Sequence, residues 1–308
     1  MTNYYRVMAG RGSSLIDDCV EGGFIGCDFD IYRDLTGKLW EDWRQFNREF
    51  IPVFLEAKPG KSKVAAGLAC SMLWTITKGL NEGDIILSPN GQGSYHVGNV
   101  TGPYRYVPGS SLPHQRPVKW REVLVARGEM SPELQRSSGS IGTVSNVSKY
   151  ATELAALLAG SPPPDLIAMD AAVEDAATFA LEKHLEDFLV ENWGQTPLGQ
   201  THRIYEVDGE KVGQQYLTDT GQMDILAISL DGSELLVVEL KRGRASDTVV
   251  GQIQRYMGFV KDELAEPGQT VRGVIIALDD DNRIRRALSV APGIDFYRYE
   301  VNFKLHKA

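Results

Sequence analysis

Cysteine is scarce in this chain, and zinc-binding motifs are missing. Among 308 residues there are three cysteines, without CxxC spacing, and five scattered histidines. An odd number of cysteines argues against a disulfide framework, and the missing spacing argues against a zinc ribbon. The histidines likewise lack the spacing of an HNH or zinc nuclease. We therefore expect Cys19, Cys27 and Cys70 to be buried thiols in a cytoplasmic protein.

Long apolar runs and nucleotide-binding loops are also missing. No apolar run reaches the roughly 20 residues that a membrane helix needs, and the first residues contain no hydrophobic segment typical of a secretory signal. The turn at 91–93 lacks the third glycine of a dinucleotide loop, and no GKS or GKT follows any glycine-rich turn. We expect no membrane segment, no nucleotide cofactor and a cytoplasmic location.

The net charge of -9 is unevenly distributed along the chain. Residues 1–160 carry 17 basic and 16 acidic side chains, whereas residues 161–308 carry 15 and 25. A protein that binds nucleic acid over a broad surface is normally basic. This chain must therefore either avoid polyanions or meet them at a local site whose acidic groups hold metal.

The length and one proline-rich segment predict two domains. Successive prolines at 162–164 cannot continue a helix and favour a stiff connector. We therefore expect one domain over 1–160 and another over 161–308. In the first, we expect helices over 62–78 and 146–158, the latter capped by Ser145 or Asn146. A hairpin at 84–100 and strands at 104–107 and 118–125 accompany them, and such short strands are typical of a small curled sheet or barrel in an α+β domain.

The second half predicts an α/β sheet with helices on its faces. Its expected order is a helix at 170–192, strands at 201–207, 223–229 and 234–240, a helix at 249–264, and a strand at 270–278. A short helix and a final strand follow within 282–303. The apolar run at 235–238 is typical of a central strand buried on both faces.

Two acids and a lysine coincide with these central strands. Glu239 and Lys241 are two residues apart and share one face of a strand, while Asp224 begins the neighbouring strand. Two carboxylates with room for water suit Mg²⁺ (or Mn²⁺), and the lysine can stabilise charge developing on a phosphate. The pattern therefore suits metal-assisted phosphodiester hydrolysis. The alternative is an ordinary Lys–Glu ion pair where a strand emerges into solvent.

The residues around this set resemble a known nuclease family. Asp224, a gap of 14 residues and Glu239-Leu-Lys241 match the PD-(D/E)XK pattern, although Gln222-Met223 stands where other members have proline. The segment from GQMDILAI through LLVVELKRGRASD to VVGQIQRYMGFVKDEL is similar to the catalytic domain of NucS endonucleases and Mrr-type restriction nucleases. The resemblance covers about residues 175–280 and implies a restriction-endonuclease-like mixed sheet flanked by helices.

The same resemblance implies roles for individual residues. It makes Asp224 and Glu239 metal ligands and Lys241 the catalytic lysine, and it adds Gln252 from the following helix. Glu182, on the preceding helix, completes the predicted catalytic and metal-binding set. Glu186, one turn further on, is the rival candidate.

Basic residues follow the lysine directly. Arg242 and Arg244 are positioned to contact phosphate oxygens near the scissile bond, and the alternative is that both are solvated surface arginines.

One run in the first half passes from Gly83-Asp84-Ile-Ile through Tyr95-His-Val-Gly98 to Val100-Thr-Gly-Pro-Tyr104-Arg-Tyr106. This run is similar to PUA-like and EVE domains, several of which hold a flipped, modified base. An extruded base needs stacking rings and polar groups at its edge. The candidate stacking rings are Trp74, Tyr104 and Tyr106, and Asp28 or Asn99 is the candidate edge reader. The alternative is that these rings belong to the core or the barrel wall.

These observations together predict a Mg²⁺-dependent DNA endonuclease that restricts modified or foreign DNA, as the Mrr resemblance implies. A repair endonuclease acting on mismatched, branched or single-stranded DNA is the alternative that the NucS resemblance implies. A DNA-binding sensor that needs a partner for activity is a second alternative. A homodimer is expected, because such nuclease domains commonly pair to cut both strands.

Overall fold

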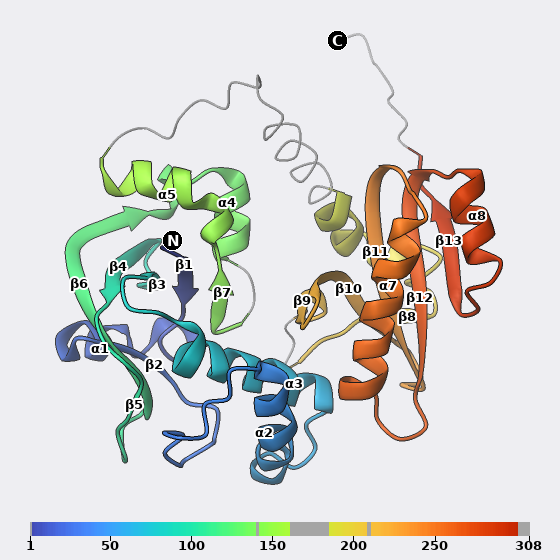
Figure 1. Cartoon of the computed structure of the whole chain (residues 1–308). Coiled ribbons are helices and arrows are strands. Elements are labelled where there is room, and N and C mark those ends of the chain that lie inside the picture. Colours follow the sequence, from blue (N-terminus) through green and yellow to red (C-terminus); the bar gives the residue numbers. More distant parts are fainter. Residues whose placement is uncertain (1, 140–141, 161–184, 208–210, 301–308) are drawn as a thin grey trace. The chain divides into compact units, whose positions relative to one another are not determined.

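The computed structural model describes residues 2–139, 142–160, 185–207 and 211–300, and the chain divides into two compact units, Met1–Ile167 and Ala168–Ala308. Figure 1 colours the first unit from blue to green and the second from yellow to red. Each unit is built around its own mixed sheet.

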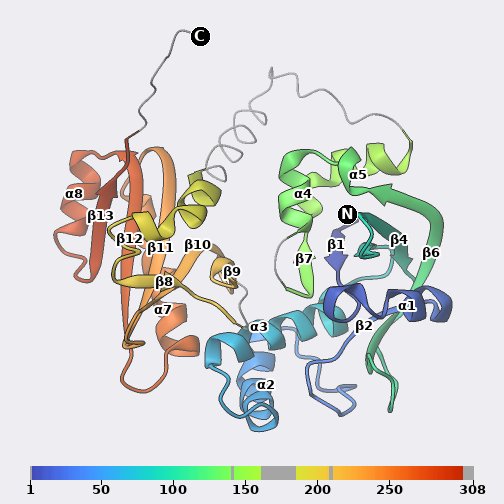
Figure 2. The same ribbon diagram turned by 180° about the vertical axis from the view of Figure 1, so that it is seen from behind.

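The first unit contains a seven-stranded sheet in the order β2-β6-β4-β3-β1-β7, with β5 paired to β6. Its strands are β1 (Tyr4–Val7), β2 (Phe24–Cys27), β3 (Ile85–Pro89), β4 (Ser94–Val100), β5 (Arg105–Tyr106), β6 (His114–Ala126) and β7 (Val144–Asn146). The long strand β6 curves along one side of this unit (Figures 1 and 2). Among the described residues the end strands β2 and β7 do not pair with each other, so the sheet is a curled half-barrel.

Helices cover this sheet and enclose two apolar cores. They are α1 (Ile16–Gly22), α2 (Trp43–Ala57), α3 (Lys63–Trp74), α4 (Pro132–Ser138) and α5 (Ala151–Leu158). The larger core joins Phe46 and Phe50 of α2 to Leu73 of α3, and the rings of Phe46 and Phe50 stack at 4.3 Å. Ser62 begins α3 by accepting a hydrogen bond from the Ala65 N–H at 3.2 Å, as is typical of a helix N-cap.

The structure confirms several expectations for this half and corrects others. The hairpin forms as β3 and β4, α3 lies within 62–78, and the three cysteines are free and buried. The helix expected from Asn146 begins only at Ala151, because Ser145 and Asn146 pair with Arg6 and Tyr5 in a strand. Of the small curled sheet or barrel that the short strands predict, the structure shows the curled sheet, a half-barrel whose end strands do not pair among the described residues.

The second unit contains a six-stranded sheet in the order β13-β12-β11-β10-β8, with β9 paired to β10. Its strands are β8 (His202–Ile204), β9 (Gln214–Thr218), β10 (Gly221–Ser229), β11 (Glu234–Arg244), β12 (Thr270–Asp279) and β13 (Ile294–Arg298), and its helices include α7 (Thr248–Phe259) and α8 (Asn282–Leu288). The pairs β11–β12 and β12–β13 are parallel, and the others are antiparallel.

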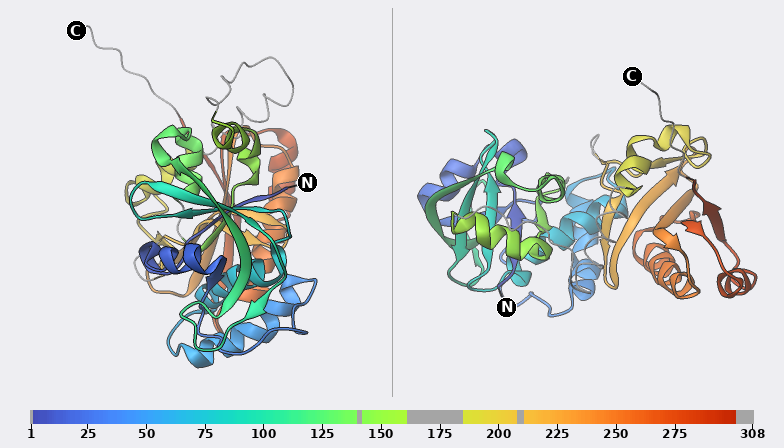
Figure 3. Two further views of the ribbon diagram at one scale, coloured as in Figure 1. Left: turned by 90° about the vertical axis from the view of Figure 1, so that its left-hand side faces the viewer. Right: turned by 90° about the horizontal axis from the view of Figure 1, so that it is seen from above.

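The two faces of this sheet are covered by different helices, as the right-hand view of Figure 3 shows. Residues 185–191 are helical and contribute Leu185 and Leu189 to a core with Val238. On the opposite face, a Cβ at Gly273 would come within 3.0 Å of Ile253 and close to Met257, both from α7. Since residues alternate along β11, Glu239 and Lys241 lie on the α7 face.

Most elements expected in this half are present, as β10, β11, α7, β12, α8 and β13. The strand expected over 201–207 is shorter, His202–Ile204, and β9 was not predicted at all. Most of the helix expected at 170–192 lies outside the described residues, apart from the helical stretch 185–191. In the part of the chain that the structure describes, no helix has both the length and the apolar character required to cross a membrane.

We expect Gly98→Ala to destabilise the first unit. A Cβ at this position of β4 would overlap Val118 and approach Trp120 to 2.8 Å, and overpacking of this kind costs about 1–3 kcal/mol. Thermal unfolding of the full chain measures the loss. Gly128→Ala is the matched control because its Cβ would meet nothing within 4 Å; equal melting temperatures for the two variants would contradict the packing argument.

Candidate active site

The antiparallel pairing of β10 with β11 brings the predicted acids together. Ile225 pairs with Val238, so the next position along each strand sets Asp224 opposite Glu239. Directly opposed residues of an antiparallel pair project from the same face, with Cβ atoms about 4.5–5.5 Å apart. The predicted proximity of these two carboxylates is therefore a consequence of strand register.

The Asp224 carboxylate is held by the backbone of the neighbouring strand. Its Oδ2 atom accepts a hydrogen bond from the Leu240 N–H at 2.7 Å. Burial raises the pKa of Asp224 well above its ordinary value, and the negative charges of Glu239 and Glu186 raise it further. The Leu240 hydrogen bond and the Lys241 charge oppose this shift. A cation between these carboxylates would relieve the repulsion that raises the pKa.

Glu239 and Lys241 form a partly buried ion pair. Glu239 is only 1% exposed, and its Oε1 atom accepts a hydrogen bond from Lys241 Nζ at 2.8 Å. The Lys241 side chain remains 28% exposed, so its ammonium group is open to solvent and to a substrate. Burying an acid this fully is costly unless a cation compensates it, and Lys241 supplies one such cation.

A third acid of the site comes from the helical stretch 185–191. Glu186 is 2% exposed, and its charge contributes to the raised pKa of Asp224. Its Oε1 atom accepts a hydrogen bond from Gln214 Nε2 at 2.7 Å, and its Oε2 atom accepts one from Gln215 Nε2. Glu186, the rival candidate, is thus a third acid whose charge acts on Asp224, while Glu182 lies outside the described residues.

Gln252 reaches the site edge together with a tyrosine that the sequence did not single out. Gln252 Nε2 donates a hydrogen bond to Tyr256 Oη at 3.3 Å, and Tyr256 Oη donates one to the Gln222 carbonyl at 3.0 Å. Burial raises the pKa of Tyr256, and the charges of Glu239 and Asp224 add to this effect. The sequence could have indicated Tyr256, because residues four positions apart on a helix, such as Gln252 and Tyr256, lie on the same face.

The two candidate DNA-binding arginines lie on the exposed end of β11. Arg242 and Arg244 are both exposed. Arg244 Nη2 donates a hydrogen bond to Asp279 Oδ2 at 3.3 Å, and the Arg242 carbonyl accepts one from Tyr299 Oη. Phosphate contacts by these exposed arginines stay a prediction.

Three of the five candidate base-pocket residues surround a buried histidine. Tyr104 Oη shares a hydrogen bond with His114 Nδ1 at 2.9 Å, and the Tyr106 ring lies 5.3 Å from the His114 ring. Asp28 acts on the His114 pKa, which burial lowers below its ordinary value. The Tyr104 ring is partly buried and packs against the main core.

The other two candidates lie on different elements. Trp74 ends α3, and its Nε1 atom donates a hydrogen bond to the Trp40 carbonyl at 2.9 Å. Asn99 lies in β4, where its Oδ1 atom accepts two hydrogen bonds from Arg121, at 3.0 and 2.9 Å. The base pocket that these five residues would form stays a prediction.

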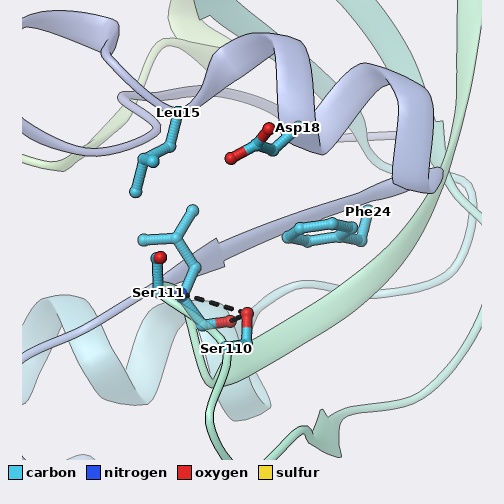
Figure 4. Close-up of a pocket in the computed structure, with 6 residues that line it drawn as sticks. Leu15, Asp18, Phe24, Ser110 and Ser111 are labelled. Atoms are coloured by element: carbon cyan, nitrogen blue, oxygen red, sulfur yellow. Dashed lines mark hydrogen bonds between the residues drawn. The ribbon is translucent and has the colours of Figure 1, made fainter.

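One small hollow in the first unit lies elsewhere (Figure 4). It has a volume of about 80 Å³, below the 300–1,000 Å³ typical of ligand pockets. None of the five base-pocket candidates lines it. The lining residues are Leu15, Asp18, Phe24, Ser110, Ser111 and Leu112.

The acidic set of the second unit fits a hard divalent cation by its donor chemistry. Mg²⁺ is commonly held by one or two carboxylates together with several waters, and Asp224 and Glu239 supply such a pair. Within the described ranges, no three His, Cys, Asp or Glu side chains already stand as the ligands of one ion. A third ligand from Glu186 would thus require its carboxylate to approach the pair when the ion binds.

Each of the two units matches a known protein family. Residues 181–301 match the family described as the endonuclease NucS C-terminal domain. The second unit is a NucS-type endonuclease domain. Residues 5–147 match a family described as a domain of unknown function, DUF8426. No curated protein matches the sequence.

Solved structures of repair endonucleases show a distant likeness. One is of an EndoMS–dsDNA complex, with 16% identity and a TM-score of 0.34 over 71% of this chain and 66% of that one. Another, a repair endonuclease from Pyrococcus abyssi, has 16% identity and a TM-score of 0.31, covering 69% and 66%. The chain thus spans just under two thirds of the length of these relatives.

We expect Asp224→Asn to stabilise the metal-free protein at neutral and mildly alkaline pH. The native pKa exceeds the value of about 3.9 in an unfolded chain, so the native state binds a proton more tightly. This tighter proton binding adds to the free energy of unfolding at low pH, and the added stability is lost as the pH rises through the native pKa. An amide carries no charge and avoids this loss.

Melting temperatures measured in EDTA between about pH 4 and pH 8 test this expectation. The variant should melt about 2–4 °C above the native chain at the upper end and show a flatter pH profile. Asp262→Asn, at an exposed position on the surface, is the control and should leave the profile unchanged. A variant that melts below the native chain at high pH would show that the charged carboxylate stabilises the fold.

Proposed function

We propose that this chain is a Mg²⁺- or Mn²⁺-dependent DNA endonuclease whose second unit hydrolyses phosphodiester bonds. The observation that carries the proposal is the pairing of Asp224 with the buried Glu239 and its partner Lys241, on adjoining strands of a NucS-type endonuclease domain. The proposal goes beyond the domain match by assigning a metal and a role to each residue.

The roles follow from the chemistry of the side chains. Asp224 and Glu239, joined by Glu186, would hold the ion, which supplies compensation for negative charge on the phosphate in the transition state. Lys241 Nζ, fixed by Glu239, points a second positive charge toward the scissile phosphate and orients the attacking water. Gln252 and Tyr256 hold the first residues of β10, and thus Asp224, in position.

Arg242 and Arg244 would contact phosphates that flank the cut. Contacts of this kind allow a unit with an excess of acidic residues to accept DNA at one place. Cutting both strands of a duplex requires two such sites, so we propose a homodimer.

The substrate is more consistent with DNA repair than with restriction of modified DNA. The second unit matches the family described as the endonuclease NucS C-terminal domain, and this description does not mention modified bases. In the first unit, the partly buried Tyr104 ring packs against the core and its hydroxyl shares a hydrogen bond with His114, which favours a structural role for this ring. We therefore propose mismatched, branched or single-stranded DNA as the substrate class, with the first unit contributing to recognition.

Lys241→Met should abolish cleavage while the chain remains folded. The substitution keeps the length of the side chain and removes the charge that stabilises the transition state, so the rate should fall by at least about a hundredfold. Cleavage of labelled DNA with Mg²⁺, and again with EDTA, measures this loss, and Lys261→Met on the exposed surface is the control. Activity that survives EDTA or Lys241→Met would overturn the proposed chemistry.

A substrate panel separates the two proposed classes. Matched duplex, cytosine-modified duplex, mismatched duplex, flapped duplex and single-stranded DNA of equal length are compared at one enzyme concentration. We expect faster cutting of the mismatched, flapped or single-stranded DNA than of either perfect duplex, because these structures expose unpaired bases. Cutting confined to the cytosine-modified duplex would instead establish restriction of modified DNA.

A further inference from the structure

Two adjacent glutamines hold the third acid of the site from both sides. Gln214 Nε2 donates hydrogen bonds to Glu186 Oε1 at 2.7 Å and to Asp187 Oδ1 at 2.9 Å. Gln215 Nε2 donates to the other Glu186 oxygen, Oε2. The two oxygens of one nearly inaccessible carboxylate are thus bound by separate amide groups, which restricts rotation of the carboxylate.

The backbone of Gln215 adopts a conformation that glutamine rarely adopts. Its φ is +56°, in the left-handed region. In β9, Gln214 pairs with Ile225 and Tyr216 pairs with Met223, so Gln215 stands opposite Asp224 without a regular ladder pair. Such a local irregularity redirects a side chain away from its strand position, and here the Gln215 amide reaches Glu186.

The neighbouring residues secure this irregular segment to the sheet. Gly213 accepts a hydrogen bond from the Leu226 N–H at 2.7 Å, and its N–H donates to the Tyr205 carbonyl at 2.9 Å. A Cβ at Gly213 would overlap the Leu226 carbonyl, so only glycine permits the close approach. On the other side, Gln222 Nε2 donates to the Gln215 carbonyl at 3.0 Å.

We propose that Gln214 and Gln215 are positioning residues that fix the orientation of the Glu186 carboxylate, so that it can join the Asp224–Glu239 pair when a divalent ion binds. This inference rests on the proposed metal-dependent function. Outer partners of metal ligands fix ligand orientation, and their loss typically lowers metal affinity by 10–100-fold. The strained conformation of Gln215 is retained because it places a donor on Glu186 from the strand that also faces Asp224.

Mn²⁺ binding to the full chain, measured by titration calorimetry, tests this inference without relying on cleavage. Gln214→Ala and Gln215→Gly each remove one amide, and glycine also accepts the left-handed backbone. We expect each variant to lose about tenfold in Mn²⁺ affinity and to need correspondingly more Mg²⁺ for half-maximal cleavage. Gln254→Ala, at an exposed position of α7, is the control and should bind Mn²⁺ like the native chain.

The possible failures are distinguishable. If the native chain binds Mn²⁺ and both glutamine variants bind it within twofold of the native affinity, the positioning role is wrong and the proposed function survives. A lower melting temperature with unchanged Mn²⁺ affinity would likewise reduce the glutamines to a structural role. If the native chain neither binds Mn²⁺ nor cuts DNA, the proposed function fails, and the positioning role fails with it.

Discussion

The antiparallel register of β10 and β11 is the constraint on which the acidic site of the second unit depends. Register places Asp224 opposite Glu239, and burial together with nearby negative charge raises the pKa of Asp224. Burying such a cluster of acids destabilises a protein unless the charge is compensated. Here Lys241 compensates Glu239 and the Leu240 N–H supports Asp224, yet the raised pKa shows that compensation is incomplete. A divalent cation is the chemical complement of the remaining charge.

The surrounding elements serve to hold these groups at fixed places. On the α7 face, the chain of hydrogen bonds from Gln252 through Tyr256 to the Gln222 carbonyl holds the start of β10. At the edge of the sheet, β9 supports Glu186 through two amides. The first unit is built on the same principle of a curled sheet covered by helices, but its polar contacts around His114 are directed inward and are satisfied within the core.

Sequence reasoning located the acids on adjoining strands because strand periodicity is local information. Two-residue spacing places Glu239 and Lys241 on one face, and a short hairpin loop returns the chain beside Asp224. The same reasoning did not find β9, because the strand is short and Gln215 interrupts its ladder with a left-handed backbone. It also preferred Glu182 over Glu186, since one helical turn separates them and sequence spacing does not say which acid reaches the sheet.

The sequence by itself determined the α/β class of the second unit, the central strands and the acid–lysine set, because hydrophobic periodicity and residue chemistry are properties of short segments. Only the tertiary structure decided that the Glu186 charge acts on Asp224, that Tyr256 accepts a hydrogen bond from Gln252, and that Tyr104 packs against the core. Each of these outcomes depends on contacts between segments far apart in the chain, such as Gln214 with Glu186. Packing between distant elements sets those contacts, and local pattern carries no information about them.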